Sequence, residues 1–375
     1  MSGNVLGKRF VVVSFGESHG RCVGVVVDGC PAGLPFGEHD VQKYLDLRRP
    51  GTSRYYTSRL EPDEVDILSG VFNGYTTGAP IAMVVWNRDV DSDHYSEYHR
   101  RPRPGHADYV ARVKYDGFND WRGGGRFSGR ITLSHVMAGS LAIKLLEYVL
   151  SVKICAYTKR IGDVEVDKIT YEKLERRYSN PLRCPDPVIA KKMEEVLNSV
   201  MASGDSIGGV VEVVILNVPV GIGEPVFDGL EQDLSKALFS IPGVKGVEFG
   251  AGFVSSKMRG SEFNDRLVVR GSTVRYESNN MGGIVGGLSN GMPIIVRVAF
   301  RPPSSISIPQ KTVDLETLKE VDITVRGRHD PCIVPRAVPV VEATVAIVLA
   351  DHATRYGLIP PVLSKEYGKF KRRDS

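Results

Sequence analysis

Long apolar runs are missing from this sequence of 375 residues. The first residues lack the charged-then-apolar layout of a signal peptide, because only residues 10–13 form an unbroken apolar run there. The apolar stretch at residues 344–350 is far too short to span a bilayer. We therefore expect a cytoplasmic protein that does not bind a membrane.

Cysteine is also scarce, and its arrangement argues against two kinds of site. The five cysteines are odd in number, widely spaced and never arranged as CxxC: Cys22, Cys30, Cys155, Cys184 and Cys332. A zinc site or a disulfide framework would need clustered or paired cysteines. The sequence thus predicts free thiols, no metal site and a reducing compartment.

The composition that is present, 42% hydrophobic and 25% charged residues, is that of an ordinary globular protein. The length fits one large domain or two smaller ones. Neither an internal repeat nor a low-complexity linker divides the chain. We predict one catalytic domain over residues 1–365 and a basic, mobile tail over residues 366–375.

Local patterns predict both strands and helices. Runs rich in Val and Ile predict strands at residues 10–14, 23–28, 81–86, 210–216 and 294–300. Apolar periodicity and capping residues predict helices at residues 40–47, 107–115, 132–150, 186–201, 231–239 and 338–356. Because strands and helices do not alternate regularly, we expect an α+β fold rather than a doubly wound sheet.

Positive charge is concentrated in a few short segments, although the net charge is only +4. The twelve-residue segment from Arg48 to Arg59 holds four arginines and no acid, and three more arginines lie at residues 100–103. Such clusters bind nucleic acid or a small multiply charged metabolite, and a solvated basic face is the alternative. Because the arginines lie between glycine turns, without aromatic platforms or a recognition helix, we expect no nucleic acid partner.

Two histidines lie in short loops beside small residues. His19 belongs to residues 16–20 (GESHG), directly after a predicted strand, where it is placed to face a cleft rather than a core. His106 follows residues 101–105 (RPRPG), whose prolines hold the chain extended and present Arg103 and His106 from a rigid loop. Imidazoles can exchange protons near neutral pH, but surface-loop histidines are the alternative. Asp108 can simply serve the start of a helix.

Four further segments combine arginine with glycine, proline or hydroxyl residues. They are residues 48–54 (RRPGTSR), 121–130 (WRGGGRFSGR), 301–306 (RPPSSI) and 326–332 (RGRHDPC). Guanidinium groups bind phosphate and carboxylate bidentately, and glycines before a helix can cradle an anion with backbone N–H groups. Asp330 is either a general base or part of a structural ion pair. Together the segments predict an enzyme with at least two phosphate-sized anion sites.

The motifs GESHG, RRPGTSR, RPGHADY, RGGGR, GDS and GRHDPC occur in this order, and through them the chain resembles the chorismate synthase family. The resemblance extends from about Asn4 to about His352. It implies an α+β sandwich of antiparallel sheets and helices with two related halves, assembled as a homotetramer. It also implies a lyase that eliminates phosphate from 5-enolpyruvylshikimate 3-phosphate (EPSP) to give chorismate, the last step of the shikimate pathway. The elimination is anti-1,4 and uses reduced FMN without net redox change, with NADPH as a reductant.

The same resemblance implies roles by matched position. His106 would protonate the departing phosphate, His19 would keep the reduced flavin protonated, and Asp330 would assist proton removal through flavin N5. Substrate anions would be bound by Arg48, Arg54, Arg103, Arg130 and Arg328, of which Arg48 and Arg54 would also contact the nicotinamide nucleotide. FMN contacts would be made by Arg126, Phe127, Ser128, Pro242, Gly243, Gly286, Arg301, Pro302, Pro303, Ser304, Ser305 and Arg328.

One of these positions departs from the family pattern. Phe127 stands where the family usually has serine, so a side-chain hydrogen bond is replaced there by backbone contact or ring packing. The competing interpretations are a nucleic-acid binder and, among enzymes, a flavin reductase or another flavin lyase. Activity on EPSP distinguishes a chorismate synthase from a flavin reductase or another flavin lyase.

Overall fold

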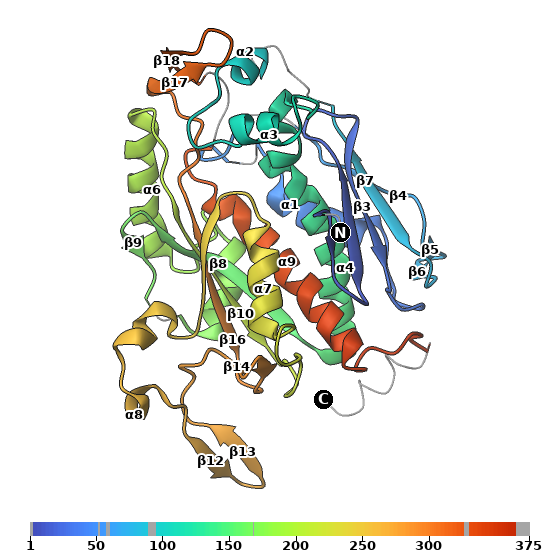
Figure 1. Ribbon diagram of the computed structural model, residues 1–375. Coiled ribbons are helices and arrows are strands. Elements are labelled where there is room, and N and C mark those ends of the chain that lie inside the picture. Colours follow the sequence, from blue (N-terminus) through green and yellow to red (C-terminus); the bar gives the residue numbers. More distant parts are fainter. Residues whose placement is uncertain are drawn as a thin grey trace.

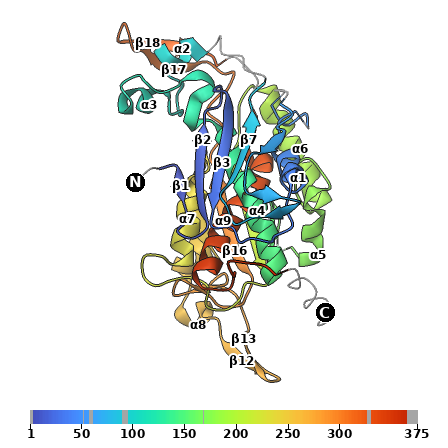
Figure 2. The ribbon, with the colours of Figure 1, turned by 90° about the vertical axis from the view of Figure 1, so that its right-hand side faces the viewer.

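The computed structural model describes residues 3–51, 53–57, 61–88, 95–167, 169–325 and 330–364. In these residues two five-stranded antiparallel sheets enclose a layer of helices (Figures 1 and 2). The predicted α+β sandwich is confirmed. The tail predicted at residues 366–375 lies outside the described residues.

The first sheet comes from the N-terminal part of the chain. From edge to edge its strands are β1 (Val5–Leu6), β2 (Val11–Gly16), β3 (Cys22–Asp28), β7 (Ile81–Trp86) and β4 (Val65–Ile67). The three strands predicted here are present. Their valines and isoleucines fill the helix-facing side, which suits β-branched residues on a half-buried sheet.

The second sheet holds the other two predicted strands. Its order is β11 (Val244–Phe249), β16 (Ile294–Phe300), β10 (Gly209–Leu216), β8 (Lys153–Ile161) and β9 (Val164–Glu165). Strand β8 was not predicted, although it pairs with β10 along its whole length. Its lysines and arginine interrupt the run of apolar residues by which the other strands were predicted.

Four helices form the layer between the sheets: α1 (Glu38–Arg48), α4 (Thr132–Leu150), α7 (Leu230–Phe239) and α9 (Val334–Arg355). Helix α6 (Pro187–Ala202) contacts β8 and β9 and begins as predicted, because the Asp186 carboxylate accepts N–H bonds from residues 188 and 189. Helix α9 starts at Val334 rather than at residue 338, because Pro335 is tolerated in a first turn.

The two halves share one topology. In the first half the strands follow the chain as β2, β3, β4 and β7, with α1 after β3 and α4 after β7. In the second half they follow as β8, β10, β11 and β16, with α7 after β10 and α9 after β16. Both sheets then place the first, second, fourth and third of these strands side by side. The repeat of topology is present although no repeat of residues was visible.

Helices α4 and α9 lie against each other in the middle of the sandwich. A Cβ atom at Gly139 of α4 would overlap Ala343 of α9, so the close approach depends on small residues. The span Gly129–Leu150, which includes α4, is long and apolar enough to cross a membrane, but 67% of its apolar window is buried inside the protein. A helix that is apolar all round suits the core of a large domain.

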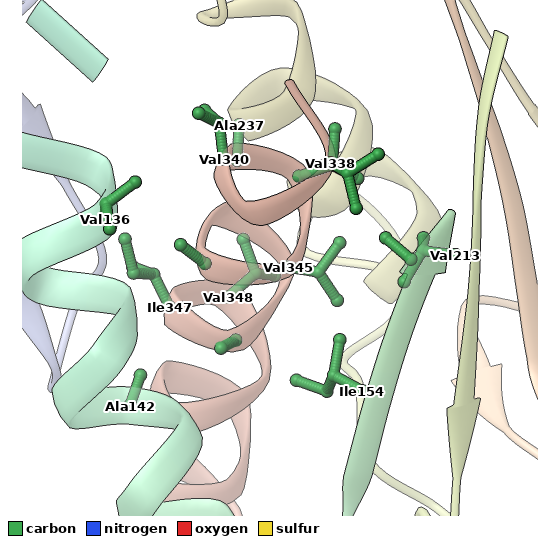
Figure 3. Close-up of a cluster of buried hydrophobic side chains, with 14 of the residues drawn as sticks. Val136, Ala142, Ile154, Val213, Ala237, Val338, Val340, Val345, Ile347 and Val348 are labelled. Carbon is green, nitrogen blue, oxygen red and sulfur yellow. The ribbon is translucent and has the colours of Figure 1, made fainter. Parts of the chain in front are cut away.

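Helix α9 joins the two sides of the core. In Figure 3 the side chain of Ile347 points toward Val136 of α4, and Val345 points toward Val213 of the second sheet. All four side chains are buried. One continuous apolar core therefore connects both halves.

Shorter elements extend from the sandwich. At one end α2 (Tyr95–Arg100) packs on the hairpin of β17 (Gln310–Asp314) and β18 (Lys319–Ile323), next to α3 (Asp108–Lys114). At the other end α8 (Gly260–Phe263) and the hairpin of β12 (Leu267–Arg270) and β13 (Thr273–Tyr276) project outward (Figures 1 and 2). The remaining short elements are β5 (Val71–Phe72), β6 (Tyr75–Thr76), β14 (Ile284–Val285), β15 (Leu288–Ser289) and α5 (Tyr171–Leu174).

Candidate active site

A cavity of about 310 Å³ opens where α1 ends and where α4 and α9 begin. This volume is typical of small-molecule sites. The cavity is lined from both halves by most of the predicted site residues: Arg48, Arg103, His106, Phe127, Ser128, Arg130, Pro242, Gly243, Arg301, Pro302, Pro303, Ser304, Ser305 and Asp330. Motifs that are far apart in the sequence thus meet at one place.

His106 is part of a charged triad at this cavity. Its Nδ1 lies 2.6 Å from the Asp108 carboxylate, which also binds Arg103 bidentately at 2.8 and 2.9 Å. Burial alone would raise the pKa of Asp108, but the bonds from Arg103 and His106 hold it well below its usual range. Arg103 Nη2 also lies 3.0 Å from Nδ1 of His106, so Asp108 and Arg103 together fix the imidazole at the cavity, where it is placed to exchange a proton.

The triglycine turn brings the two predicted histidines to the same wall. Gly123 and Gly124 have φ values of 60° and 81°, which side chains rarely adopt. A Cβ atom at Gly123 would overlap the ring of His19, and one at Gly124 would reach Cε1 of His106 at 3.2 Å. His19 is buried just outside the cavity lining, with its ring edge-on to Tyr95 at 5.1 Å. The glycines therefore make room for both imidazoles.

Two buried arginines form a second wall. Asp63 accepts bonds from Arg48 at 3.2 Å and from Arg130 at 2.9 Å, and Arg130 also donates to Asn87 at 2.6 Å. Burial, with repulsion from Arg336 and Arg130, lowers the pKa of Arg48 to about 9, so it remains a cation at neutral pH. Asp63 fixes both guanidinium groups, and a second buried carboxylate, Glu61, lies 3.5 Å from Arg130.

Among the described lining residues cations clearly exceed anions. The arginines are Arg48, Arg103, Arg130, Arg301 and Arg336, whereas the carboxylate is Asp330. Partly buried arginines with fixed geometry bind phosphate and carboxylate strongly, because the surrounding low dielectric screens them less than water does. The cavity suits a ligand with more than one anionic group.

The opposite wall combines hydrogen-bond donors that suit a phosphate with an apolar surface. The backbone N–H of Arg301 donates to the carbonyl of Gly243 at 2.9 Å, and Ser206 donates to the carbonyl of Pro303 at 2.6 Å, so the loop at residues 301–305 is held firmly. Its hydroxyls and guanidinium lie beside apolar side chains: Ile241, Phe300, Ile333, Ala337 and Val340. This donor set fits a cofactor that has an apolar ring system and a phosphate, as FMN has.

Other predicted residues lie away from the cavity lining. Arg54 is exposed and donates to the hydroxyl of Tyr55. Gly286 lies in the turn between β14 and β15, beside the start of β16, whereas Phe300 at the other end of β16 lines the cavity. Arg328 lies outside the described residues.

Arg126 is used structurally in this chain. It donates to the carbonyl of Gly16 at 2.8 Å and to the side chain of Asn4 at 2.8 Å, which ties the glycine-rich segment to β2. Phe127, by contrast, lines the cavity with its ring near Tyr115. Backbone contact and ring packing both remain predictions for the role of Phe127.

Sequence reasoning missed four residues that the structure places at the site. Asp108 was read as serving a helix start, although its spacing of two residues from His106 was a signal. Arg336 and Tyr95 line the cavity, and Asp63 holds two of its arginines. Arg336, Tyr95 and Asp63 belong to none of the motifs recognised in the sequence.

Comparison with known proteins agrees with this site. The profile of the family described as chorismate synthase matches residues 10–354. Chorismate synthases of Korarchaeum cryptofilum and Methanosarcina mazei are 55% and 52% identical to this chain, over 95% and 96% of it and 98% and 99% of their own lengths.

The fold comparison agrees as well. A crystal structure of chorismate synthase superposes with a TM-score of 0.75 at 30% identity, covering 98% of this chain and 97% of that one. Sequence, site and fold all lead to the same family. The chain belongs to the chorismate synthase family and is a carbon–oxygen lyase acting on phosphates, at the last step of the shikimate pathway to aromatic amino acids.

Proposed function

We propose that the cavity binds EPSP beside reduced FMN and that His106 and Asp330 move the protons of the elimination. In the anti-1,4-elimination the C3–O bond to phosphate and the C6–H bond break, a ring double bond forms, and nothing is oxidised or reduced overall. The observation that carries this proposal is the His106–Asp108–Arg103 triad, which opens onto a cavity rich in fixed arginines.

The arginines explain how the substrate is bound. EPSP carries a phosphate and two carboxylates, and Arg48, Arg103 and Arg130 line the cavity in fixed orientations. Each donor that is already oriented toward a leaving phosphate commonly lowers the barrier by about 3 kcal/mol. We assign Arg54 and Arg328 to the same substrate on the resemblance alone.

The proton steps follow from the positions of the two titratable groups. His106, whose Nδ1 lies 2.6 Å from the Asp108 carboxylate, is assigned to donate a proton to the departing phosphate oxygen. Asp330 lies in the lining as a carboxylate and is assigned to the side where the C6 proton leaves. Reduced FMN, when bound, supplies an electron-rich ring that stabilises positive charge on the substrate.

The FMN site is assigned to the wall formed by residues 301–305, Pro242, Gly243, Phe127 and Ser128. His19 belongs to the flavin side of this site, and contacts from Arg126 and Gly286 remain predictions. NADPH contacts at Arg48 and Arg54 also remain a prediction. We further propose a homotetramer in the cytoplasm, with residues 1–365 as one domain, which the continuous core supports.

The decisive experiment is an anaerobic assay with EPSP and reduced FMN in which phosphate and chorismate are both measured. Because the elimination is redox-neutral, we expect many chorismate molecules per reduced flavin. One product per flavin consumed would identify a true oxidoreductase instead. Flavin reduction without any phosphate release would favour the flavin reductase interpretation.

Phe127→Ser should change FMN affinity by less than about tenfold, roughly 1.4 kcal/mol. The reason is that Phe127 lines the cavity with its ring packed toward Tyr115, so the backbone and the surrounding loop carry the contact. Titration of the protein with FMN measures the effect. A larger change in either direction would show that the ring, or the missing hydroxyl, determines flavin binding.

A further inference from the structure

The Asp330 carboxylate is held from two sides. Its Oδ1 accepts the backbone N–H of Thr57 at 2.9 Å, and its Oδ2 binds Nη1 of Arg336 at 2.6 Å. All three residues line the cavity, and the side chains of Asp330 and Arg336 are only 13% and 15% exposed. Charge-assisted bonds of this kind are short and strong, so they fix the orientation of a carboxylate.

Arg336 also connects this carboxylate to the arginine segment. Its Nε donates to the backbone carbonyl of Arg48 at 3.3 Å, at the last residue of α1. Thr57 lies at the far end of the segment that begins at Arg48. Arg336 on α9 therefore contacts Asp330 directly. Through Arg336 the pair is bonded to Arg48, and through Asp330 it is bonded to Thr57.

The position of Arg336 is unfavourable for stability considered alone. It lies in the first turn of α9, where the helix dipole disfavours a cation. It also faces Arg48, another buried cation. Asp330 is the contact that compensates both effects, which is a reason to look for a functional role in the pair.

We propose that Arg336 is the positioning residue of the elimination, which holds the Asp330 carboxylate in its orientation at the cavity and ties it to the segment carrying Arg48. This inference rests on the proposed role of Asp330 in assisting removal of the C6 proton. Arg336 acts through Asp330 rather than on the substrate. Within the described residues, the charged or titratable groups facing Asp330 are Arg336, Arg48 and Cys332.

The test compares three variants with the wild-type chain, using EPSP and reduced FMN under anaerobic conditions. Arg336→Met should lower kcat by about 10²-fold, since small misplacements of a reacting group have effects of that size. It should change KM little.

Arg336→Lys keeps the charge but loses the planar guanidinium that bonds the Asp330 carboxylate through Nη1 and the Arg48 carbonyl through Nε. It should therefore have a kcat between those of the wild type and Arg336→Met. Arg355→Met is the matched control, because Arg355 lies at the other end of α9 and also binds carboxylates, Asp228 and Asp233. It should lower thermal stability without changing kcat.

The outcomes separate the two levels of the proposal. A wild-type chain that releases no phosphate from EPSP overturns the proposed function, and this inference with it. An active wild type with an unchanged kcat in Arg336→Met overturns only the role of Arg336. A rise in KM alone would assign Arg336 to substrate binding instead. Arg336→Gln carries the same test if Arg336→Met does not fold.

Discussion

His106→Ala should lower the rate of phosphate release by about 10²–10⁴-fold at saturating EPSP and reduced FMN. The imidazole lies at the cavity with Asp108 2.6 Å behind it, so its removal takes away a proton donor whose charge is held in place. A proton donor acts mainly in the transition state, so kcat should fall while KM changes much less. The limb of the pH–rate profile that reports a protonated acid should also disappear.

His39→Ala provides the matched control for this prediction. His39 is an exposed histidine on α1, with 83% of its side chain accessible, and its loss should leave turnover unchanged. A His106→Ala variant with normal kcat and a raised KM would instead show that His106 only binds an anion. Asp108→Asn should fall between the wild type and His106→Ala, because it removes the negative charge behind the imidazole but keeps the imidazole itself.

The local parts of this fold could be predicted from the sequence. The strands near residues 11–16 and 294–300 each begin with three consecutive β-branched residues, and Asp186 with Pro187 marks the start of α6. Strand β8 escaped prediction because what defines it is its pairing with β10, a partner distant in the sequence. The two related halves were implied only by the family resemblance, because the shared topology exists in strand order and not in residue identity.

The site was predictable where motifs carry the chemistry. His106, Arg103 and the 301–305 segment converge because each lies next to the end of a rigid element. The contacts made by Asp63 and Arg336 were not predictable, because Asp63 meets Arg130 across 67 residues and Arg336 meets Arg48 across 288. Long-range ion pairs follow from packing, and no local pattern specifies them.

Glu342→Ala should lower the free energy of unfolding by about 3–5 kcal/mol, the usual loss when one partner of a buried ion pair is removed. Glu342 on α9 is 1% exposed and accepts bonds from the backbone N–H of Ala156 at 2.8 Å, Nε of Arg177 at 2.9 Å and the hydroxyl of Tyr178 at 2.7 Å. Truncation leaves all three donors without this acceptor. Urea unfolding followed by circular dichroism measures the loss.

The cause of this loss can be tested with two further variants. Glu195→Ala removes an exposed glutamate from α6 and should change the free energy of unfolding by no more than about 0.5 kcal/mol. Arg177→Met added to Glu342→Ala removes the uncompensated charge, so it should recover part of the lost stability, as apolar replacement of complete buried pairs often does. If the double variant is no more stable than Glu342→Ala, the cost lies in the orphaned N–H of Ala156 and hydroxyl of Tyr178 rather than in the guanidinium. If Glu342→Ala itself loses less than about 1 kcal/mol, within the range of exposed pairs, water must reach this part of the core and the network does not hold α9 to β8.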